Sequence, residues 1–514
     1  MSININSLRT SMRFSGLASG LDTEQMVKDL MKAEKYKVDK LKQDKQIVEW
    51  RKEQYREMIS SLQAFKRDFF DRANPKNLML TPNAYRTFVV KSSASDIVTA
   101  TANSDASAGQ IVIDRVDRLA DSARVTSSAA APGVDTALGA GSVLSITVNG
   151  KKTEIAVTQG MTYRQVMEAV NGSSAGVRMA YNSFTQRYSV ATNGTGLNQT
   201  LFLEGSLFAG LGLTTPAAVT GQDAIFVIAG TSHSRSGNIF TVDGITYSLN
   251  KLSTVPVTIA VAQDVETAYQ NIKGFINKYN DLMEKINGKT REKRYPDFRP
   301  LTDEQRESLK DKEVDQWEVK AKSGLLNGDT LLQRMALEMR KALTDAGSGS
   351  GVTLSSIGIT TVGYYERGKL HIDEVKLKAA LTTNSEQVMN LFSKSSSVAY
   401  SPDMTSAERS RRYSSSGLAV RLADIVEDNI RTTRDKNDNK GFLLQRAGIT
   451  GDTTESQNFM DDQIKRINER IDRATNVLQR REDRYWRQFT VLETAMSRLN
   501  SQSAWLTQQF SAQG

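Results

Sequence analysis

The chain has 514 residues with 67 basic and 58 acidic side chains, so most of the charges behind its formal +9 can find opposite neighbours. That length predicts about three or four domains, and a hydrophobic content of 39% can fill several modest cores, which excludes wholesale disorder. The absence of cysteine excludes disulfides and thiolate ligands, and two histidines, His233 and His371, leave little material for a catalytic triad or a histidine metal site.

We expect neither a cleavable secretory signal nor a membrane span. The first twenty residues are polar and lack the apolar core of a signal peptide. No run approaches the roughly 18 consecutive apolar residues of a membrane helix, and the longest comparable stretch, Ala224 to Ala229, has the length of a buried strand. The protein is therefore expected in the cytoplasm, or outside the cell after export by a route that reads no such signal.

A long helix is predicted near the N-terminus, after a flexible segment of residues 1–20. Asp22 can cap this helix while Gln25 completes a capping box, and Pro75 should end it. Apolar side chains recur with the alternating four- and three-residue spacing of a coiled-coil seam. These seam residues are Val27, Met31, Val38, Leu41, Val48, Tyr55, Ile59, Leu62 and Phe69.

The interior is predicted to be rich in β-structure. Of the 34 glycines, 17 lie between Gly109 and Gly244. Asn149-Gly150 and Asp243-Gly244 separate alternating apolar residues and are typical of type I′ hairpin turns. A helix from about Thr162 to Val170 interrupts the strands.

Helices are predicted again after the β-rich interior. Asp264 can cap a helix that should end at Gly288. A small β-hairpin is expected near residues 352–372. Shorter helices should begin after three further capping residues, Thr302, Asp329 and Asp373.

Two stretches of this later region are predicted to lack regular structure. Gly347 to Gly351 alternates glycine and serine, the composition of a flexible linker. The stretch from Ser395 to Ser416 is rich in serine and poor in apolar residues, which predicts a mobile loop.

A second long helix is predicted at the C-terminus, because neither glycine nor proline occurs from Asp452 to Gln513. Arg481 and Glu482 interrupt its apolar seam. About 50 helical residues span roughly 75 Å, longer than an ordinary domain, so we expect the terminal helices to pair with each other or with other chains. The C-terminal seam residues are Ile464, Ile467, Ile471, Leu478, Tyr485, Phe489, Leu492, Met496 and Leu499, with Ala474 among them.

The predicted fold class is a multidomain α+β protein, in which long terminal helices form a coiled-coil or helical-bundle leg and nested β-rich domains are inserted in the middle. Residues 21–80 and 264–510 should form the leg. One β-rich domain should comprise residues 84–132 and 221–262. Residues 134–220 should form a second β-rich domain, inserted into the first. Limited proteolysis that destroys this β-rich region while sparing the terminal segments would contradict the layout.

Two motifs have the spacing of a ligand-binding loop but lack residues that such a loop needs. Gly363 to Lys369 has the spacing of a phosphate-binding loop, but Leu370 stands where magnesium needs a hydroxyl and the neighbours predict a hairpin. Asp435, Asn437 and Asn439 have the spacing of a calcium loop. Lys440 stands where that loop needs glycine and Arg446 where it needs a bidentate glutamate.

The remaining candidates also favour structural roles. His233 lies in a predicted Thr/Ser/Gly-rich loop, and His371 at the end of the predicted hairpin, without an evident nucleophile. Basic clusters at Lys289–Arg294 and Arg480–Arg487 include aromatic residues, but interleaved acidic residues favour solvated helix faces over nucleic-acid binding. We therefore predict no catalytic residue, no metal site and no cofactor.

Several motifs, spread over nearly the whole chain, carry a resemblance to a known family. They are Phe14–Thr23, Met26–Val27, Leu30–Glu34, Lys278–Asn280, Pro300–Gln305, Trp317, Ala321–Leu326, Asp329, Glu482, Arg484–Tyr485, Gln488–Thr490, Leu492–Glu493, Met496, Leu499–Ser503 and Trp505–Leu506. With these residues the chain resembles the flagellar filament cap family, also called flagellar hook-associated protein 2, and Gly141 to Gly196 resembles the repeat-like insert shared with flagellins.

This resemblance implies a secreted, non-enzymatic component at the distal tip of the bacterial flagellum. It implies a homo-oligomeric ring that helps incoming flagellin subunits fold and insert. It also implies export through the flagellar type III apparatus, with a cytoplasmic export chaperone, and neither nucleic acid nor membrane as a partner. Contacts with the filament end should be numerous but individually weak, because the cap must step around that end as each subunit adds.

Three alternatives stay open at this point. A hook–filament junction protein would share the terminal heptads and the export route. A contribution to adhesion, with the exposed β-rich region binding host glycans or mucin, is compatible with the same layout. An enzyme in the β-rich interior is disfavoured, because no pair of nucleophile and base is visible in the sequence.

Overall fold

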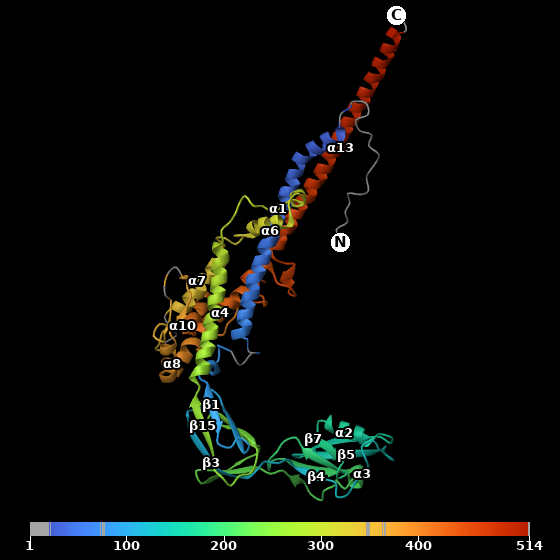
Figure 1. Ribbon diagram of the computed structural model, residues 1–514. Helices are drawn as coiled ribbons and strands as arrows, with labels where there is room; N and C mark the ends of the chain where they lie inside the picture. Colours follow the sequence, from blue (N-terminus) through green and yellow to red (C-terminus); the bar gives the residue numbers. More distant parts are fainter. Residues whose placement is uncertain are drawn as a thin grey trace. The chain divides into compact units, whose positions relative to one another are not determined.

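The computed structural model describes residues 22–71, 78–345, 350–361 and 366–511, together with Gly20, Ala73 and Gly363. The predicted flexible segment, apart from Gly20, and most of the predicted glycine–serine linker lie outside the described residues. The α+β class is confirmed: long N- and C-terminal helices pack together, and β-sheets are inserted between them (Figure 1). The chain forms two compact units.

The helical unit comprises residues up to Leu80, Gly274–Ile372 and the residues from Asn390 onward. Beside its helices it holds a two-stranded ladder of β16 (Ile359–Thr360) and β17 (His371–Ile372). The helices, some of which begin outside these ranges, are α1 (Thr23–Phe69), α4 (Val265–Arg291), α5 (Asp303–Ser308), α6 (Asp311–Lys322), α7 (Thr330–Thr344), α9 (Ser385–Ser393), α10 (Ser406–Ser415), α11 (Leu418–Ile430), α12 (Phe442–Ala447) and α13 (Phe459–Ser511).

The predicted helix caps form. The Asp22 carboxylate accepts the backbone N–H of Gln25 at 2.9 Å, although the Gln25 side chain donates to Asp29 rather than back to the cap. Thr302 and Gln305 form a complete capping box at α5. Asp329 accepts from the N–H of Leu332 at 3.0 Å and so begins α7. Each cap satisfies a backbone donor that the first turn of its helix leaves free.

Asp329 also holds α1 against α7. Its second carboxylate oxygen accepts the hydroxyl of Tyr55, which is fully buried in α1. Burial, with the bond to Asp329, raises the pKa of Tyr55, so this phenol stays a donor at neutral pH.

We expect Asp329→Ala to lower the free energy of unfolding of the helical unit by about 2–4 kcal/mol, because it removes a cap and leaves a buried hydroxyl unpaired. Thr302→Ala, the loss of an exposed cap alone, should cost about 1 kcal/mol. Urea unfolding followed by far-UV circular dichroism measures both. Equal costs for the two variants would show that the bond to Tyr55 contributes nothing.

Two expectations for the helical unit are wrong. Helix α4 does not end at Gly288 but continues to Arg291, because the flanking Ile286 and Thr290 are buried and their packing outweighs the weak helix propensity of glycine. The Ser-rich stretch is not a loop throughout, since α10 occupies Ser406–Ser415 and begins with a capping box of Thr405 and Glu408.

Charged contacts hold α10 on α11. Arg412 binds the Asp424 carboxylate through two nitrogens, at 2.6 and 2.7 Å, and Arg409 binds Asp428 at 2.7 Å. The hydroxyl of Tyr400 donates to the other oxygen of Asp428 at 2.8 Å. The stretch therefore folds on ion pairs rather than on an apolar face, which explains why its composition predicted a loop.

The β-rich unit comprises residues Thr81–Lys273 and Asp373–Met389, the latter including α8 (Glu374–Thr383). Its first part has a five-stranded antiparallel sheet in the order β1-β15-β3-β11-β12 and a three-stranded sheet in the order β13-β14-β2. The strands are β1 (Phe88–Ser92), β2 (Val98–Ala102), β3 (Gly109–Arg118), β11 (Ala224–Ile228), β12 (Thr231–Arg235), β13 (Ile239–Val242), β14 (Ile245–Leu249) and β15 (Val257–Gln263).

The chain leaves the five-stranded sheet after β3 and returns to the neighbouring strand β11, where Phe226 pairs with Val116. The intervening residues form two further sheets, ordered β10-β9-β5-β6 and β4-β8-β7, around a core that includes Leu144, Tyr188 and Phe208. These elements are β4 (Arg124–Thr126), β5 (Ser142–Val148), β6 (Lys151–Val157), α2 (Tyr163–Asn171), β7 (Val177–Asn182), β8 (Arg187–Thr192), β9 (Thr200–Glu204), α3 (Ser206–Gly210) and β10 (Val219–Thr220).

The structure differs from the expected layout at β4. Residues 84–132 were assigned by sequence to the outer β-rich domain, but Val125 pairs with Val190 and belongs to the inner core. A three-residue strand carries too little pattern to reveal its partner. The division of the chain into the four predicted parts stays a prediction.

The predicted hairpin turns form where the sequence placed them. Asn149 and Gly150 have φ of 50° and 79°, and Asp243 and Gly244 have 48° and 75°, the left-handed values of type I′ turns. The placement of His233 in a loop is wrong, because it lies in β12, where its ring stacks on Phe226 with centroids 5.8 Å apart.

Candidate assembly surface

The two terminal helices pack side by side in opposite directions. Lys52 of α1 binds Asp461 near the start of α13 at 2.5 Å, and Glu34 of α1 binds Arg481 further along α13. Residues earlier in α1 therefore meet residues later in α13. Figure 1 shows α13, in red, running along α1, in blue, and continuing beyond the point where α1 begins.

The apolar seam of α1 is buried over most of its length. Val27, Val38 and Val48 are each at most 6% exposed, while Met31 and Leu41 are half-buried. The second half packs against more than α13, because α1 also contacts α11 and α12. In that half Tyr55, Ile59, Leu62 and Phe69 are buried, and their surroundings make them part of a helical core.

The seam of α13 becomes more exposed toward the C-terminus. Ile467 is buried, and Leu492 and Leu499 are 43% and 57% exposed. The other predicted seam residues, Ile464, Ile471, Leu478, Tyr485, Phe489 and Met496, are half-buried.

From the level of the first turn of α1 toward its own C-terminus, α13 presents an apolar surface that we call the distal stripe. Leu492, Leu499 and Leu506 repeat every seven residues, so they lie along one side of the helix. Trp505 adds a further aromatic surface at 58% exposure. Exposed apolar residues at heptad spacing are the arrangement by which a helix packs against another helix. The distal stripe comprises Val491, Leu492, Leu499, Trp505 and Leu506.

Ion pairs account for polar residues that interrupt the seams. Arg481 breaks the apolar pattern of α13, and its partner Glu34 occupies a seam position of α1. Lys52 and Asp461, with side chains 15% and 24% exposed, form a second interhelical pair. Charges at matching positions fix the register of two helices, so the interruption of the seam contributes to the pairing.

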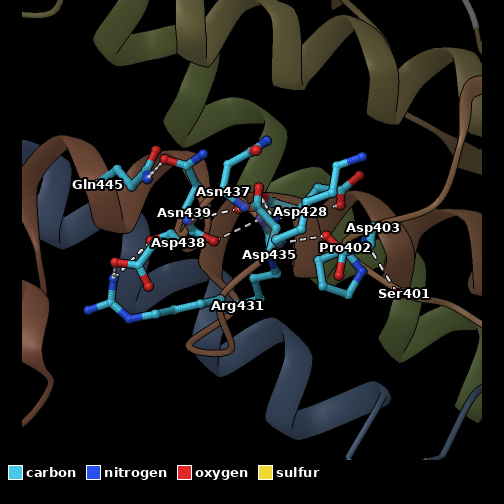
Figure 2. Close-up of polar contacts among 12 residues, drawn as sticks. Ser401, Pro402, Asp403, Asp428, Arg431, Asp435, Asn437, Asp438, Asn439 and Gln445 are labelled. Atoms are coloured by element: carbon cyan, nitrogen blue, oxygen red, sulfur yellow. Dashed lines mark hydrogen bonds and ion pairs between the residues drawn. The ribbon is translucent and has the colours of Figure 1, made fainter.

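In the loop with calcium-like spacing, the polar side chains form hydrogen bonds with other groups of the protein (Figure 2). Asp435 Oδ1 accepts the backbone N–H groups of Asn437 and Asn439, both at 2.9 Å, and the bond from Asn439 lowers the pKa of Asp435. Asn439 Oδ1 accepts from Gln445 at 2.6 Å. Within the described residues no group of His, Asp or Glu is arranged to hold a metal ion.

Lys440, which occupies the glycine position of that loop, binds Asp452 instead. Its ammonium lies 2.8 and 2.7 Å from the two carboxylate oxygens. Burial opposes ionisation of Asp452, but the bonds from Lys440 and Thr454 prevail and lower its pKa to about 2. Because this pKa lies below that of the unfolded chain, the pair stabilises the fold above pH about 4 and is lost as the pH falls toward 2.

We expect Asp452→Asn to destabilise the helical unit by about 1–2 kcal/mol at neutral pH and to flatten the acid limb of its stability curve. The control is Asp438→Asn, which removes the exposed pair with Arg434 and should cost at most about 0.5 kcal/mol. Thermal unfolding between pH 7 and pH about 2 measures both. A constant difference between Asp452→Asn and the unsubstituted chain across this range would contradict the assignment.

The segment with the spacing of a phosphate-binding loop contributes one side-chain contact that the sequence did not reveal. His371 Nε2 lies within hydrogen-bond distance of the Glu366 carboxylate, a pairing that the sequence alone does not indicate.

None of the described helices is long and apolar enough to cross a membrane.

Comparison with known proteins identifies the family. Residues 19–123 match the model of the N-terminal region of flagellar hook-associated protein 2, and residues 221–501 match that of its C-terminal region. Flagellar hook-associated protein 2 of Halalkalibacterium halodurans is 30% identical over 97% of this chain and 100% of its own. The A-type protein of Pseudomonas aeruginosa is 25% identical over 98% of each chain.

A solved structure supports the fold. The D1-D2-D3 domains of the flagellar cap protein FliD from Escherichia coli superpose with a TM-score of 0.53 at 22% identity, over 73% of this chain and 97% of that one. At this identity the likeness bears on the fold alone.

The family models match residues 19–123 and 221–501, and the Halalkalibacterium halodurans relative matches 97% of the chain, so both favour the cap over the junction alternative. The family consists of structural flagellar components, so the chain is not an enzyme. The chain belongs to the flagellar hook-associated protein 2 family, the filament caps of the bacterial flagellum.

Proposed function

We propose that this protein sits outside the cell at the distal tip of the flagellum and promotes the insertion and polymerisation of exported flagellin subunits. The observation that carries the proposal is the distal stripe, a row of exposed apolar side chains on a rigid helix that extends past its partner. A Leu or Trp side chain that becomes buried in such a contact contributes about 1.5–3 kcal/mol. Contacts of this size are individually weak and numerous, as a cap that moves with the growing end requires.

The proposed partners are further copies of this chain, arranged in a ring, and flagellin. Export would use the flagellar type III apparatus, with a cytoplasmic chaperone covering the distal stripe before secretion. Apolar patches of this kind need cover in the cytoplasm, because they otherwise associate without specificity.

Deletion of the gene, followed by complementation, tests the proposed function. Cells that lack the protein should release unpolymerised flagellin into the medium and carry few or no filaments. The full chain should restore filaments and reduce flagellin in the medium. Normal filaments without the protein would contradict the proposal.

A contribution to adhesion is a second candidate that one observation favours. Phe184, in the turn between β7 and β8, is 97% exposed. An aromatic ring held this far in solvent suits stacking on a sugar face. If the candidate is right, Phe184→Ser should reduce binding of the purified chain to mucin, and binding that survives removal of residues 134–220 would exclude it.

A further inference from the structure

The end of α4 forms one side of a basic groove of about 930 Å³. The turn at residues 366–369 forms another part of its wall, so the groove joins segments about eighty residues apart in sequence. Both segments belong to the helical unit. Five cationic side chains line the groove: Lys285, Lys289, Arg291, Arg367 and Lys369.

Three of these cations are available for a partner. Lys285 donates to Ser61 at 2.8 Å and Lys369 lies 3.5 Å from Glu284. Among the described residues, the side chains of Lys289, Arg291 and Arg367 take part in no ion pair and donate no hydrogen bond. We call these three residues the groove cations.

The carboxylates in the wall are fewer than the cations. Glu284, Glu292 and Glu366 stand against the five cationic side chains. Glu284 lies beside Lys369, and the Oε2 of Glu292 is buried without a hydrogen-bond partner. The groove therefore keeps an excess of positive charge and fits an anionic ligand.

The wall at Arg367 is a tight turn. Arg367 and Gly368 have φ of +55° and +92°, left-handed values like those of the hairpin turns at Asn149-Gly150 and Asp243-Gly244. The carbonyl of Arg367 accepts from the Asn287 side chain at 3.5 Å, so a contact with α4 helps to hold the turn.

An acidic surface on α6 complements the groove. Asp311 and Asp315 are exposed, and the ion pairs among the described residues include neither of them. They are four residues apart on one face of α6, a like-charge spacing that weakens an isolated helix. Val319, one turn further along, is 70% exposed. We call Asp311, Asp315 and Val319 the acidic ridge.

The ridge lies on a firmly held element. Trp50 of α1 packs with Ala321 near the end of α6 and with Leu325 just after it, and the Trp317 indole N–H donates to the backbone carbonyl of Arg299 at 2.7 Å. The ridge can therefore meet a partner as a preformed surface, at little cost in ordering.

We propose that the groove cations of one copy bind the acidic ridge of a neighbouring copy. The occupant is a second copy of this chain because it carries an unpaired anionic surface that matches the unpaired cations in charge and is edged by an aliphatic side chain. Two different surfaces make a head-to-tail contact, which closes into a ring when the rotation between copies allows it. The inference rests on the proposed function and names the contact that would build the ring.

A charge-swap experiment on the full chain tests the proposal. Lys289→Glu with Arg291→Glu, and separately Asp311→Lys with Asp315→Lys, should each weaken self-association about tenfold or more. A chain that carries all four substitutions should recover most of the lost association, because it restores opposite charges across the contact. Sedimentation velocity measures association, and circular dichroism checks that each variant is folded.

The control is Arg178→Glu with Arg187→Glu, the same change in charge at two exposed positions of the β-rich unit, which should leave association unchanged. Association of the unsubstituted chain should also be weaker at about 1 M than at about 0.1 M salt. Equal association of all variants, failure of the combined variant to recover, or a chain that never self-associates would overturn the proposal.

Two further outcomes separate this inference from the proposed function. Weaker binding of the groove variant to purified flagellin, with unchanged self-association, would assign the groove to flagellin and overturn the inference. If the groove variant and the ridge variant both self-associate as the unsubstituted chain does and also support normal filament growth, the inference is overturned while the cap function stays in place.

Discussion

Phe275→Ala is expected to lower the free energy of unfolding of the helical unit by about 3–5 kcal/mol. Phe275 is fully buried, and its ring lies 5.6 Å from that of Phe65, 5.3 Å from that of Phe69 and 6.5 Å from that of Phe392. These rings come from α1, α4 and α9, so one truncation opens a cavity where three helices meet. Aromatic contacts add to the loss of apolar burial.

The matched control is Phe442→Ala. Phe442 is 45% exposed and lies under the guanidinium of Arg334, so its loss should cost less than about 1 kcal/mol. Urea unfolding followed by far-UV circular dichroism compares the two variants. Similar costs for Phe275 and Phe442 would show that the aromatic cluster does not anchor these helices.

Leu499→Asp combined with Leu506→Asp is expected to abolish filament growth and leave the folded chain intact. Both side chains lie in the distal stripe, and α13 does not bury them within one copy. Each should lose about 1.5–3 kcal/mol of apolar contact in the assembly and add a charge that is costly to bury. Filament lengths on complemented cells, together with thermal unfolding of the purified variant, measure the two effects.

The control for this pair uses the opposite face of the same helix. Ser497→Asp with Ala504→Asp adds the same charge at exposed positions that are also seven residues apart. These cells should grow filaments of normal length. Equal loss in both variants would mean that charge on α13, rather than the distal stripe, limits growth.

Local patterns were sufficient to predict most elements of the fold. The caps at Asp329 and Thr302 and the turns at Asn149-Gly150 and Asp243-Gly244 depend on a few adjacent residues, so the sequence contains their full cause. The turn at Ala229-Gly230 also has left-handed φ, of 49° and 73°, yet alanine gives no signal for it. Pairing of β11 with β12 imposes that conformation.

Elements that depend on distant partners were harder to predict. Helix α10 has no buried residue, and it is held by ion pairs to α11 that composition cannot reveal. Helix α4 passes Gly288 because tertiary burial on both sides of the glycine outweighs its propensity. Both errors treat a local preference as decisive where packing decides.

The candidate surface was predicted in part. Heptad spacing predicts a seam on each terminal helix, but only the structure shows which of the seam residues stay exposed, because exposure depends on where α1 begins relative to α13. The interruption at Arg481 had no explanation in the sequence until Glu34 was found opposite it. The basic groove could not be predicted, since its two walls are far apart along the chain.

Electron microscopy of filaments that carry a labelled full chain tests the central claim most directly. If the protein is a cap that assembles through the distal stripe, the label should lie at the distal end of each filament. Cells that produce the labelled Leu499→Asp, Leu506→Asp variant should carry few or no filaments, and none with label at its tip. Label at the filament base, or at the tip in equal amounts with the variant, would contradict the account.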